Sequence, residues 1–224
     1  MTTDQFVFDR AGFPMIWVEA IDAHMHWMPV TKIQFEYFLC DEPDSHFNAK
    51  WYDDVLYLNP RITPNAIRRN NYWEAFLTGI MPSEAQRFAR WCGNQYAIPT
   101  LGEWYEAYQA LKARPANPEI ISAMMDLHGR RRSVLEQLAS ASDMAFREMR
   151  YTNRTLADQM LMRMGVMEWV ECRNRHFQWG GMGETHPDFY GGLFTPEHGD
   201  PHTPNNPEAD RLRAYGFRLV RRSV

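Results

Sequence analysis

Cysteine is scarce in this sequence, which has three residues of this type in 224. They are Cys40, Cys92 and Cys172, and no two have the C-x-x-C spacing of zinc ribbons or thioredoxin-type redox sites. An odd number of widely spaced cysteines forms no disulfide framework and is typical of a reducing compartment. Because Cys40 and Cys92 each end a helical pattern with aromatic neighbours, we expect both thiols to be buried as small hydrophobic groups.

Long apolar runs are also missing. No stretch of about 18 apolar residues occurs, so we expect no membrane span. Residues 1–10 combine neither a basic start nor a continuous apolar stretch, and a secretory signal peptide is therefore not expected. The expected location is the cytoplasm.

Positive charge is not in excess. The sequence has 24 Lys and Arg against 28 Asp and Glu, whereas nucleic-acid-binding proteins normally show a basic surplus. We therefore predict no nucleic-acid partner. The one basic run, residues 130–132, is interpreted as a solvated helix face.

Apolar and aromatic residues are plentiful. Hydrophobic residues make up 45% of the chain and aromatic residues 14%, which is enough for a core that needs no disulfides. The eight tryptophans indicate a fold pinned by large aromatic side chains. No internal repeat or clear linker is visible, so residues 1–224 are predicted to form a single domain.

Local signals place several elements in the first half of the chain. Residues 6–8 and 15–20 are β-rich. Thr31 is a candidate N-cap of a first helix, and two further helices carry predicted capping boxes. The boxes are Ser83 with Gln86, in a helix stopped by Gly93, and Thr100 with Glu103. Residues 41–76, rich in Pro, Asn and Asp, are predicted to be a loop held by aromatic rings.

The second half changes character along its length. Residues 113–160 are predicted to be mainly helical, with Met- and Leu-rich stripes that pack in the core. From residue 165 short strands and long loops follow, and residues 183–209 have the composition of an exposed loop. Residues 215–220 alternate like a closing strand, which we expect to lie beside an early strand.

Six segments, in order, resemble one known family. They are residues 29–35 (PVTKIQF), 83–92 (SEAQRFARWC), 98–104 (IPTLGEW), 165–169 (GVMEW), 177–182 (FQWGGM) and 216–220 (GFRLV). They are similar to the patterns PVTNxxF, WxxAxxYCxW, LPTEAEWE, GNVWEW, VxRGGSW and GFRLV of the formylglycine-generating enzyme (sulfatase-modifying factor) family. That family has a variant of the C-type lectin fold. The resemblance implies an α+β fold with a helical insertion around residues 113–160.

The catalytic parts of that family are not matched. Its oxidases bind copper through two cysteines after the GGSW segment, and soft thiolates suit copper(I). No cysteine follows Cys172 here, so the resemblance implies no formylglycine formation. Relatives that form sulfur–carbon bonds bind iron through a separate helical domain, which this chain lacks. His24 and His26 are therefore interpreted as plain strand or loop residues rather than metal ligands.

Calcium binding is not expected either. The family holds calcium partly through its GNVWEW loop, but Gly165 stands at the Asn position and Leu161 at the preceding Asp position. Glu168 is retained, and we predict that it is a hydrogen-bonding residue that braces the loop. Gly180 and Gly181 are expected to permit a close backbone approach.

Polar residues concentrate near the C-terminus. They are His186, Asp188, Glu197, His198, Asp200 and His202. They have no dependable metal-ligand spacing, and no G-x-S-x-G elbow indicates a serine hydrolase. We therefore predict no catalytic residue, no metal and no cofactor.

Three functions stay open: a binding module, an enzyme and a structural subunit. The preferred one is a non-catalytic module that binds a partner protein through C-terminal loops, because function commonly lies on loops of a rigid scaffold. Such domains resemble variable proteins of diversity-generating retroelements and domains of bacterial signalling and defence systems. The candidate contacts are Trp179, Met182, His186, Asp188, Phe189, Tyr190, Phe194 and His198. The alternative is a metal-dependent enzyme that uses the C-terminal histidines, and the third is a structural subunit that assembles through residues 113–160. The oligomeric state stays open.

Overall fold

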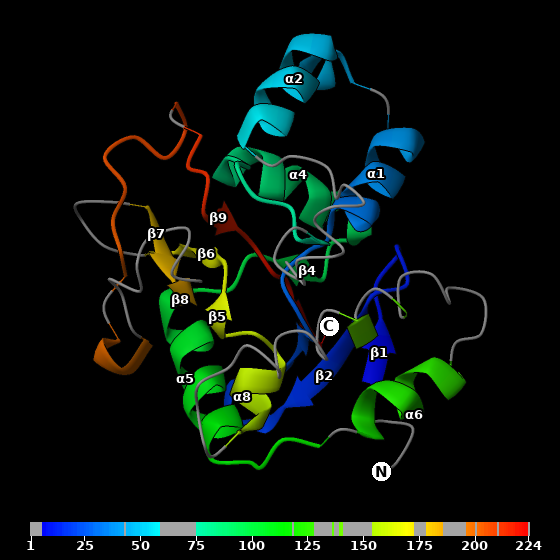
Figure 1. Cartoon of the computed structure of the whole chain (residues 1–224), viewed down its shortest axis with the longest axis vertical. Coiled ribbons are helices and arrows are strands. Elements are labelled where there is room, and N and C mark those ends of the chain that lie inside the picture. The colour runs from blue at the N-terminus through cyan, green and yellow to red at the C-terminus, as the bar shows by residue number, and fades with distance from the viewer. Residues whose placement is uncertain are drawn as a thin grey trace.

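The computed structural model shows a mixed α+β chain, which confirms the predicted class (Figure 1). It describes residues 6–42, 44–58, 75–117, 119–127, 136, 139–140, 154–172, 178–185, 196–199, 201–209 and 211–223. Within these ranges no helix has the length and apolar character needed to cross a membrane.

The largest sheet has five antiparallel strands in the order β1-β2-β3-β10-β4. Their bounds are Phe6–Phe8 (β1), Pro14–Val18 (β2), Ala23–His26 (β3), Val220–Arg222 (β10) and Tyr96–Ala97 (β4). Val220 of β10 lies opposite Met25 on one side and Ala97 on the other. The expectation that the C-terminal strand lies beside an early strand is confirmed.

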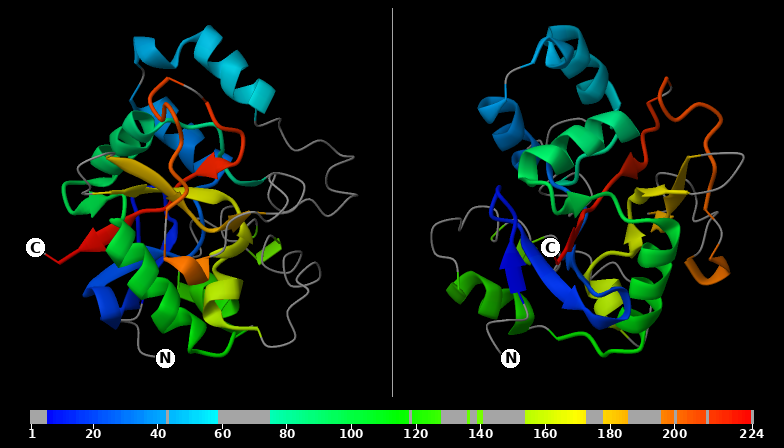
Figure 2. Two further views of the ribbon diagram at one scale, coloured as in Figure 1. Left: turned by 90° about the vertical axis from the view of Figure 1, so that its left-hand side faces the viewer. Right: turned by 180° about the vertical axis from the view of Figure 1, so that it is seen from behind.

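Two smaller sheets complete the β structure. Strand β6 (Met167–Glu171) pairs antiparallel with β7 (Trp179–Met182) and parallel with β9 (Tyr215–Gly216). Strands β5 (Arg163–Gly165) and β8 (Glu184–Thr185) pair in parallel. The single closing strand predicted over residues 215–220 is wrong. The chain pairs in one sheet at β9 and in another at β10, and the three buried residues between them cross from sheet to sheet (Figure 2).

Helices pack around these sheets. Their bounds are Glu19–Ile21 (η2), Lys32–Asp41 (α1), Ser45–Phe47 (η3), Ala49–Leu58 (α2), Pro82–Cys92 (α4), Leu101–Lys112 (α5), Glu119–Leu127 (α6), Leu156–Gln159 (α8) and Pro196–His198 (η6). Thr31 caps α1 as predicted, and Thr100 with Glu103 forms the predicted capping box of α5. At α1, Gln34 completes a capping box that was not predicted. Gly93 ends α4 with φ of 139°, a backbone angle that side chains disfavour, which confirms its predicted role.

The predicted start of α4 is wrong. The helix begins at Pro82, and Glu84 rather than Gln86 reaches back to cap it, accepting from Met81 N–H at 3.0 Å. Proline suits this first helical position because its fixed φ fits the helix and its missing N–H would have no intrahelical partner. Ser83 therefore lies inside the first turn, and its N–H donates to Glu208 at 3.2 Å.

The predicted loop over residues 41–76 is also wrong, because it contains η3 and α2. Trp51 and Val55 lie one helical turn apart on α2 and are both buried. The ring of Trp51 stacks on Phe35 and meets Phe47 edge-on. Trp51, which looked like a loop anchor, thus belongs to the buried face of a helix. Residues 59–74 lie outside the described part of the chain.

The region from residue 113 to 160 is described in part. Helices α6 and α8 fall within it, whereas most of residues 128–153, over which the helical prediction also extends, lie outside the described residues. Met160, Leu161, Met162 and Met164 are buried, which confirms that they serve as core packing.

The cysteines differ in environment. Cys40 is exposed, so the expectation of a buried thiol is wrong at that position. It follows the buried Phe38 by two residues on α1 and therefore faces away from the core. Cys92 is partly buried, and burial raises the pKa of its thiol. Cys172 is buried, with its pKa raised by burial to about 11.

Candidate functional site

Three of the six segments meet at one buried ion pair. Glu168 of β6 accepts from Arg218 at 2.5 Å (Nε) and 2.6 Å (Nη2), and Trp104 Nε1 donates to the same carboxylate at 2.9 Å. All three side chains are fully buried. Arg218 also donates to the carbonyls of His26 (3.2 Å) and Met160 (2.9 Å). Glu168 is therefore a hydrogen-bond acceptor that holds its neighbouring segments together, as predicted. Through Arg218 it joins the three-stranded sheet, which contains β6, to the five-stranded sheet, which contains His26.

A second buried polar cluster lies behind the first strands. Asp9 accepts from Gln34 Nε2 at 3.2 Å and lies 3.0 Å from His26 Nε2. Leu219 N–H donates to His26 Nδ1 at 3.2 Å, so this nitrogen carries no proton and Nε2 donates to Asp9. The Asp9 and His26 side chains are completely buried, which makes this pair a structural link between β3 and the chain end. The strand interpretation of His24 and His26 is confirmed.

The double glycine of β7 brings the C-terminal loop (residues 201–209) against the sheet. Gly181 exchanges two backbone hydrogen bonds of 2.8 Å with His202. A Cβ added at Gly180 would lie 2.6 Å from Pro201 Cβ, and one at Gly181 would lie 2.5 Å from Tyr215 Cε1. Side chains at these positions would push away the loop and the tyrosine ring. The predicted close approach is thereby confirmed.

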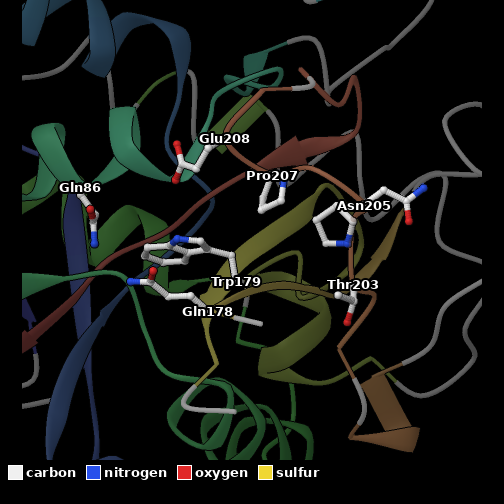
Figure 3. Close-up of a pocket in the computed structure, with 8 residues that line it drawn as sticks. Gln86, Gln178, Trp179, Thr203, Asn205, Pro207 and Glu208 are labelled. Carbon is white, nitrogen blue, oxygen red and sulfur yellow. The ribbon is translucent and has the colours of Figure 1, made fainter. Parts of the chain in front are cut away.

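A groove of about 580 Å³ forms where this loop passes β7 and α4. Its lining comprises Gln86, Gln178, Trp179, Thr203, Pro204, Asn205, Pro207 and Glu208 (Figure 3). Gln86 comes from α4, Trp179 from the start of β7 and Gln178 from the position just before it. The other lining residues come from the C-terminal loop. The volume lies within the range of about 300–1,000 Å³ that small-ligand sites in proteins commonly have.

Just beyond the C-terminal loop, Arg211 anchors the chain to a buried carboxylate. Arg211 donates to both oxygens of Glu84, at 2.7 and 2.8 Å, and to the Gly79 carbonyl at 2.9 Å. Trp51 Nε1 lies 2.6 Å and His46 Nε2 lies 2.9 Å from the same carboxylate. Burial by itself would raise the pKa of Glu84, but the hydrogen bonds and charge of Arg211 and the capping N–H outweigh it and lower the pKa.

Helix η6, just before the loop, is anchored to α5. Tyr108 Oη donates to Glu197 at 2.9 Å, and Lys112 Nζ donates to the same oxygen at 3.0 Å. Burial and the adjacent Glu197 raise the pKa of Tyr108, whereas the cationic Lys112 and Arg163 help to keep the pKa of Glu197 low despite burial. Glu197, one of the C-terminal polar residues, is thus already paired with a cation.

The structure places the predicted contact residues differently. Trp179 lines the groove with 5% of its surface exposed, whereas Met182 is fully buried in the core and lies outside the groove lining. His198 belongs to η6, but its side chain is not among those described. The remaining predicted contacts, His186, Asp188, Phe189, Tyr190 and Phe194, lie outside the described residues.

Most of the groove lining was not predicted from the sequence. The missed residues are Gln86, Gln178, Thr203, Pro204, Asn205, Pro207 and Glu208. The only local signal was the density of Pro, Asn and Thr over residues 201–207, which indicates an exposed loop but not what it faces.

Metal ligation finds no support in the described side chains. Among them, no group of three His, Cys, Asp or Glu residues is arranged to hold an ion. The ring of His202 contacts Tyr215 Oη. His186, Asp188 and Asp200 lie outside the described part of the chain.

Comparisons of the chain with protein-family models, curated proteins and solved structures find no match.

Proposed function

We propose that this chain is a formylglycine-generating-enzyme-like domain, with a C-type-lectin-like fold and a helical insertion around residues 113–160. The buried ion pair supports the proposed relationship. Trp104, Glu168 and Arg218 each belong to one of the resembling segments, and each is a residue that the family pattern shares. Their direct contact gives a physical reason for these segments to occur together in one fold.

We further propose that the domain is a non-catalytic binding module for a partner protein. The groove between β7 and the C-terminal loop is the observation that carries this proposal. Gln86, Gln178 and Asn205 contribute primary amides to its described lining, and Trp179 adds an aromatic ring. The amides of Gln86 and Gln178 lie toward the indole of Trp179, whereas that of Asn205 points away from it (Figure 3). Aromatic and polar groups of this kind are common in protein interfaces. The anchors at Glu84 and Glu197 hold the surrounding segments in place, so little ordering is needed on binding.

The chemistry of the lining favours binding over catalysis. Among the described lining residues the one titratable side chain is the carboxylate of Glu208, and no basic residue of that set accompanies the Thr203 hydroxyl. Nucleophilic catalysis requires a nucleophile within reach of a base. We propose a bacterial signalling or defence system, or a retroelement-encoded variable protein, as the setting for this binding module.

Substitutions at the rim of the groove test the proposal. Gln178 and Asn205 are exposed, so Gln178→Arg and Asn205→Arg place long side chains in the groove without opening a cavity in the core. After the partner is identified by co-purification from the native host, each variant should weaken its binding at least about tenfold in calorimetry, because an occupied groove excludes the partner. Gln109→Arg, on the exposed face of α5 and outside the lining, is the matched control.

Two outcomes contradict the proposed function. One is unchanged partner affinity in both rim variants when their unfolding midpoints equal that of the wild type. The other is a stoichiometric transition metal in protein purified without chelator, lost on the double substitution His198→Ala and His202→Ala, which would instead favour the metal-dependent enzyme.

A further inference from the structure

The described lining of the groove carries one formal charge, which is negative. Glu208 is the only ionisable side chain among the described lining residues, and it is exposed. Its Oε1 accepts from Ser83 N–H at 3.2 Å, and the structure shows no cation paired with it among the described residues. A carboxylate that accepts one hydrogen bond at one oxygen retains acceptor capacity at its other oxygen.

Two described cations near the groove are already paired. Arg211, just beyond the loop, is bound to the buried Glu84, and Arg87 of α4 is paired with Asp44. Arg90 follows Gln86 by one turn on α4 and is not among the described lining residues. Within the described lining, an anionic ligand would meet a carboxylate and no cation, which is unfavourable.

The prolines of the lining reduce its backbone donors. Pro204 and Pro207 have no backbone N–H but keep their carbonyl oxygens, so this wall of the groove offers fewer backbone donors than acceptors. The primary amides of Gln86 and Gln178 can both accept and donate, so they are compatible with a ligand that donates. Trp179 contributes an indole ring, and the negative face of such a ring attracts ammonium and guanidinium groups.

We propose that the groove takes a cationic side chain, lysine or arginine, from a segment of the partner protein. This inference rests on the proposed function and adds to it the chemical class of the group that is recognised. Glu208 is the specificity-determining residue of the site, because its charge distinguishes a cationic side chain from a neutral one of similar length.

Short blocked peptides provide a direct test. Three pentapeptides carry arginine, lysine or norleucine between pairs of glycines, with acetylated and amidated ends, and each is titrated into the full-length protein by NMR or calorimetry. Both cationic peptides should bind about three- to tenfold more tightly than the norleucine peptide, the range expected for an exposed ion pair with an aromatic contact. The preference should decrease as salt is raised.

Glu208→Gln should abolish this preference, whereas Glu106→Gln, on the exposed face of α5, should leave it unchanged. Equal binding of all three peptides to the wild type, absence of binding, or an unchanged preference in Glu208→Gln would each overturn the inference.

Partner binding then separates the two proposals. If the rim variants lose the partner and Glu208→Gln retains full affinity, the binding module stands and the cationic specificity fails. If the rim variants also retain the partner, the proposed function itself fails.

Discussion

Replacing Glu168 by glutamine would leave a buried arginine without its counter-ion. The carboxylate accepts two hydrogen bonds from Arg218 and one from Trp104, and the three side chains are fully buried. The guanidinium cannot release its proton, so its charge stays in the core. In addition, the NH₂ group of the glutamine would replace one carboxylate oxygen and would face an N–H donor of Arg218 or Trp104.

The expected cost follows from this arrangement. Breaking a buried pair by removing one partner destabilises a protein by about 3–5 kcal/mol, because the other charge is left uncompensated. For a chain of this size, about 2–4 °C of unfolding midpoint corresponds to 1 kcal/mol, so the midpoint should fall by roughly 6–20 °C. Replacing both partners by apolar residues, as in Glu168→Leu with Arg218→Met, should cost less than Glu168→Gln because no buried charge remains.

Thermal and urea unfolding followed by circular dichroism and tryptophan fluorescence measure these differences. Glu171→Gln is the matched control, since it removes the same charge from the same strand at a half-buried position. It should change the free energy of unfolding by no more than about 0.5 kcal/mol. A loss below about 1 kcal/mol in Glu168→Gln, or a double variant less stable than the single one, would refute the assignment of Glu168 and Arg218 as a buried, mutually compensating pair.

Two further predictions concern pH and backbone packing. The folded-state pKa of Glu84 lies below its ordinary value of 4.5, so its contribution to stability is complete above that pH and is lost as the pH falls through the folded-state pKa. Urea unfolding should therefore show a smaller loss of stability on acidification below about pH 4.5 in Glu84→Gln than in the wild type, and equal losses would contradict the role of Glu84. Gly181→Ala should cost about 1–3 kcal/mol, because its Cβ would lie 2.5 Å from the Tyr215 ring. Gly102→Ala, where nothing lies within 4 Å of the added Cβ, should instead stabilise the protein by about 0.4–1 kcal/mol, and similar effects at both glycines would show that the crowding at β7 is not real.

Signals that act over a few residues were sufficient to predict part of the structure. Thr31 and Thr100 cap their helices through bonds that span three residues, so the sequence pattern contains the whole interaction. The strand at residues 6–8 and the core packing of the methionines at 160–164 follow from residue type in the same way. The helix over residues 49–58 was missed because Pro, Asn and Asp around it dominate the composition of the wider segment.

The sequence by itself thus determined the α+β class, two helix starts, the need for small residues at positions 180 and 181, and the hydrogen-bonding role of Glu168. Only the tertiary structure decided that the chain end divides between two sheets and that α4, β7 and the C-terminal loop together form a groove. The anchor of that loop, Arg211 on Glu84, joins residues separated by 127 positions. A contact between residues so far apart in the sequence produces no local pattern of periodicity or spacing, because the fold of the intervening chain brings the two groups together.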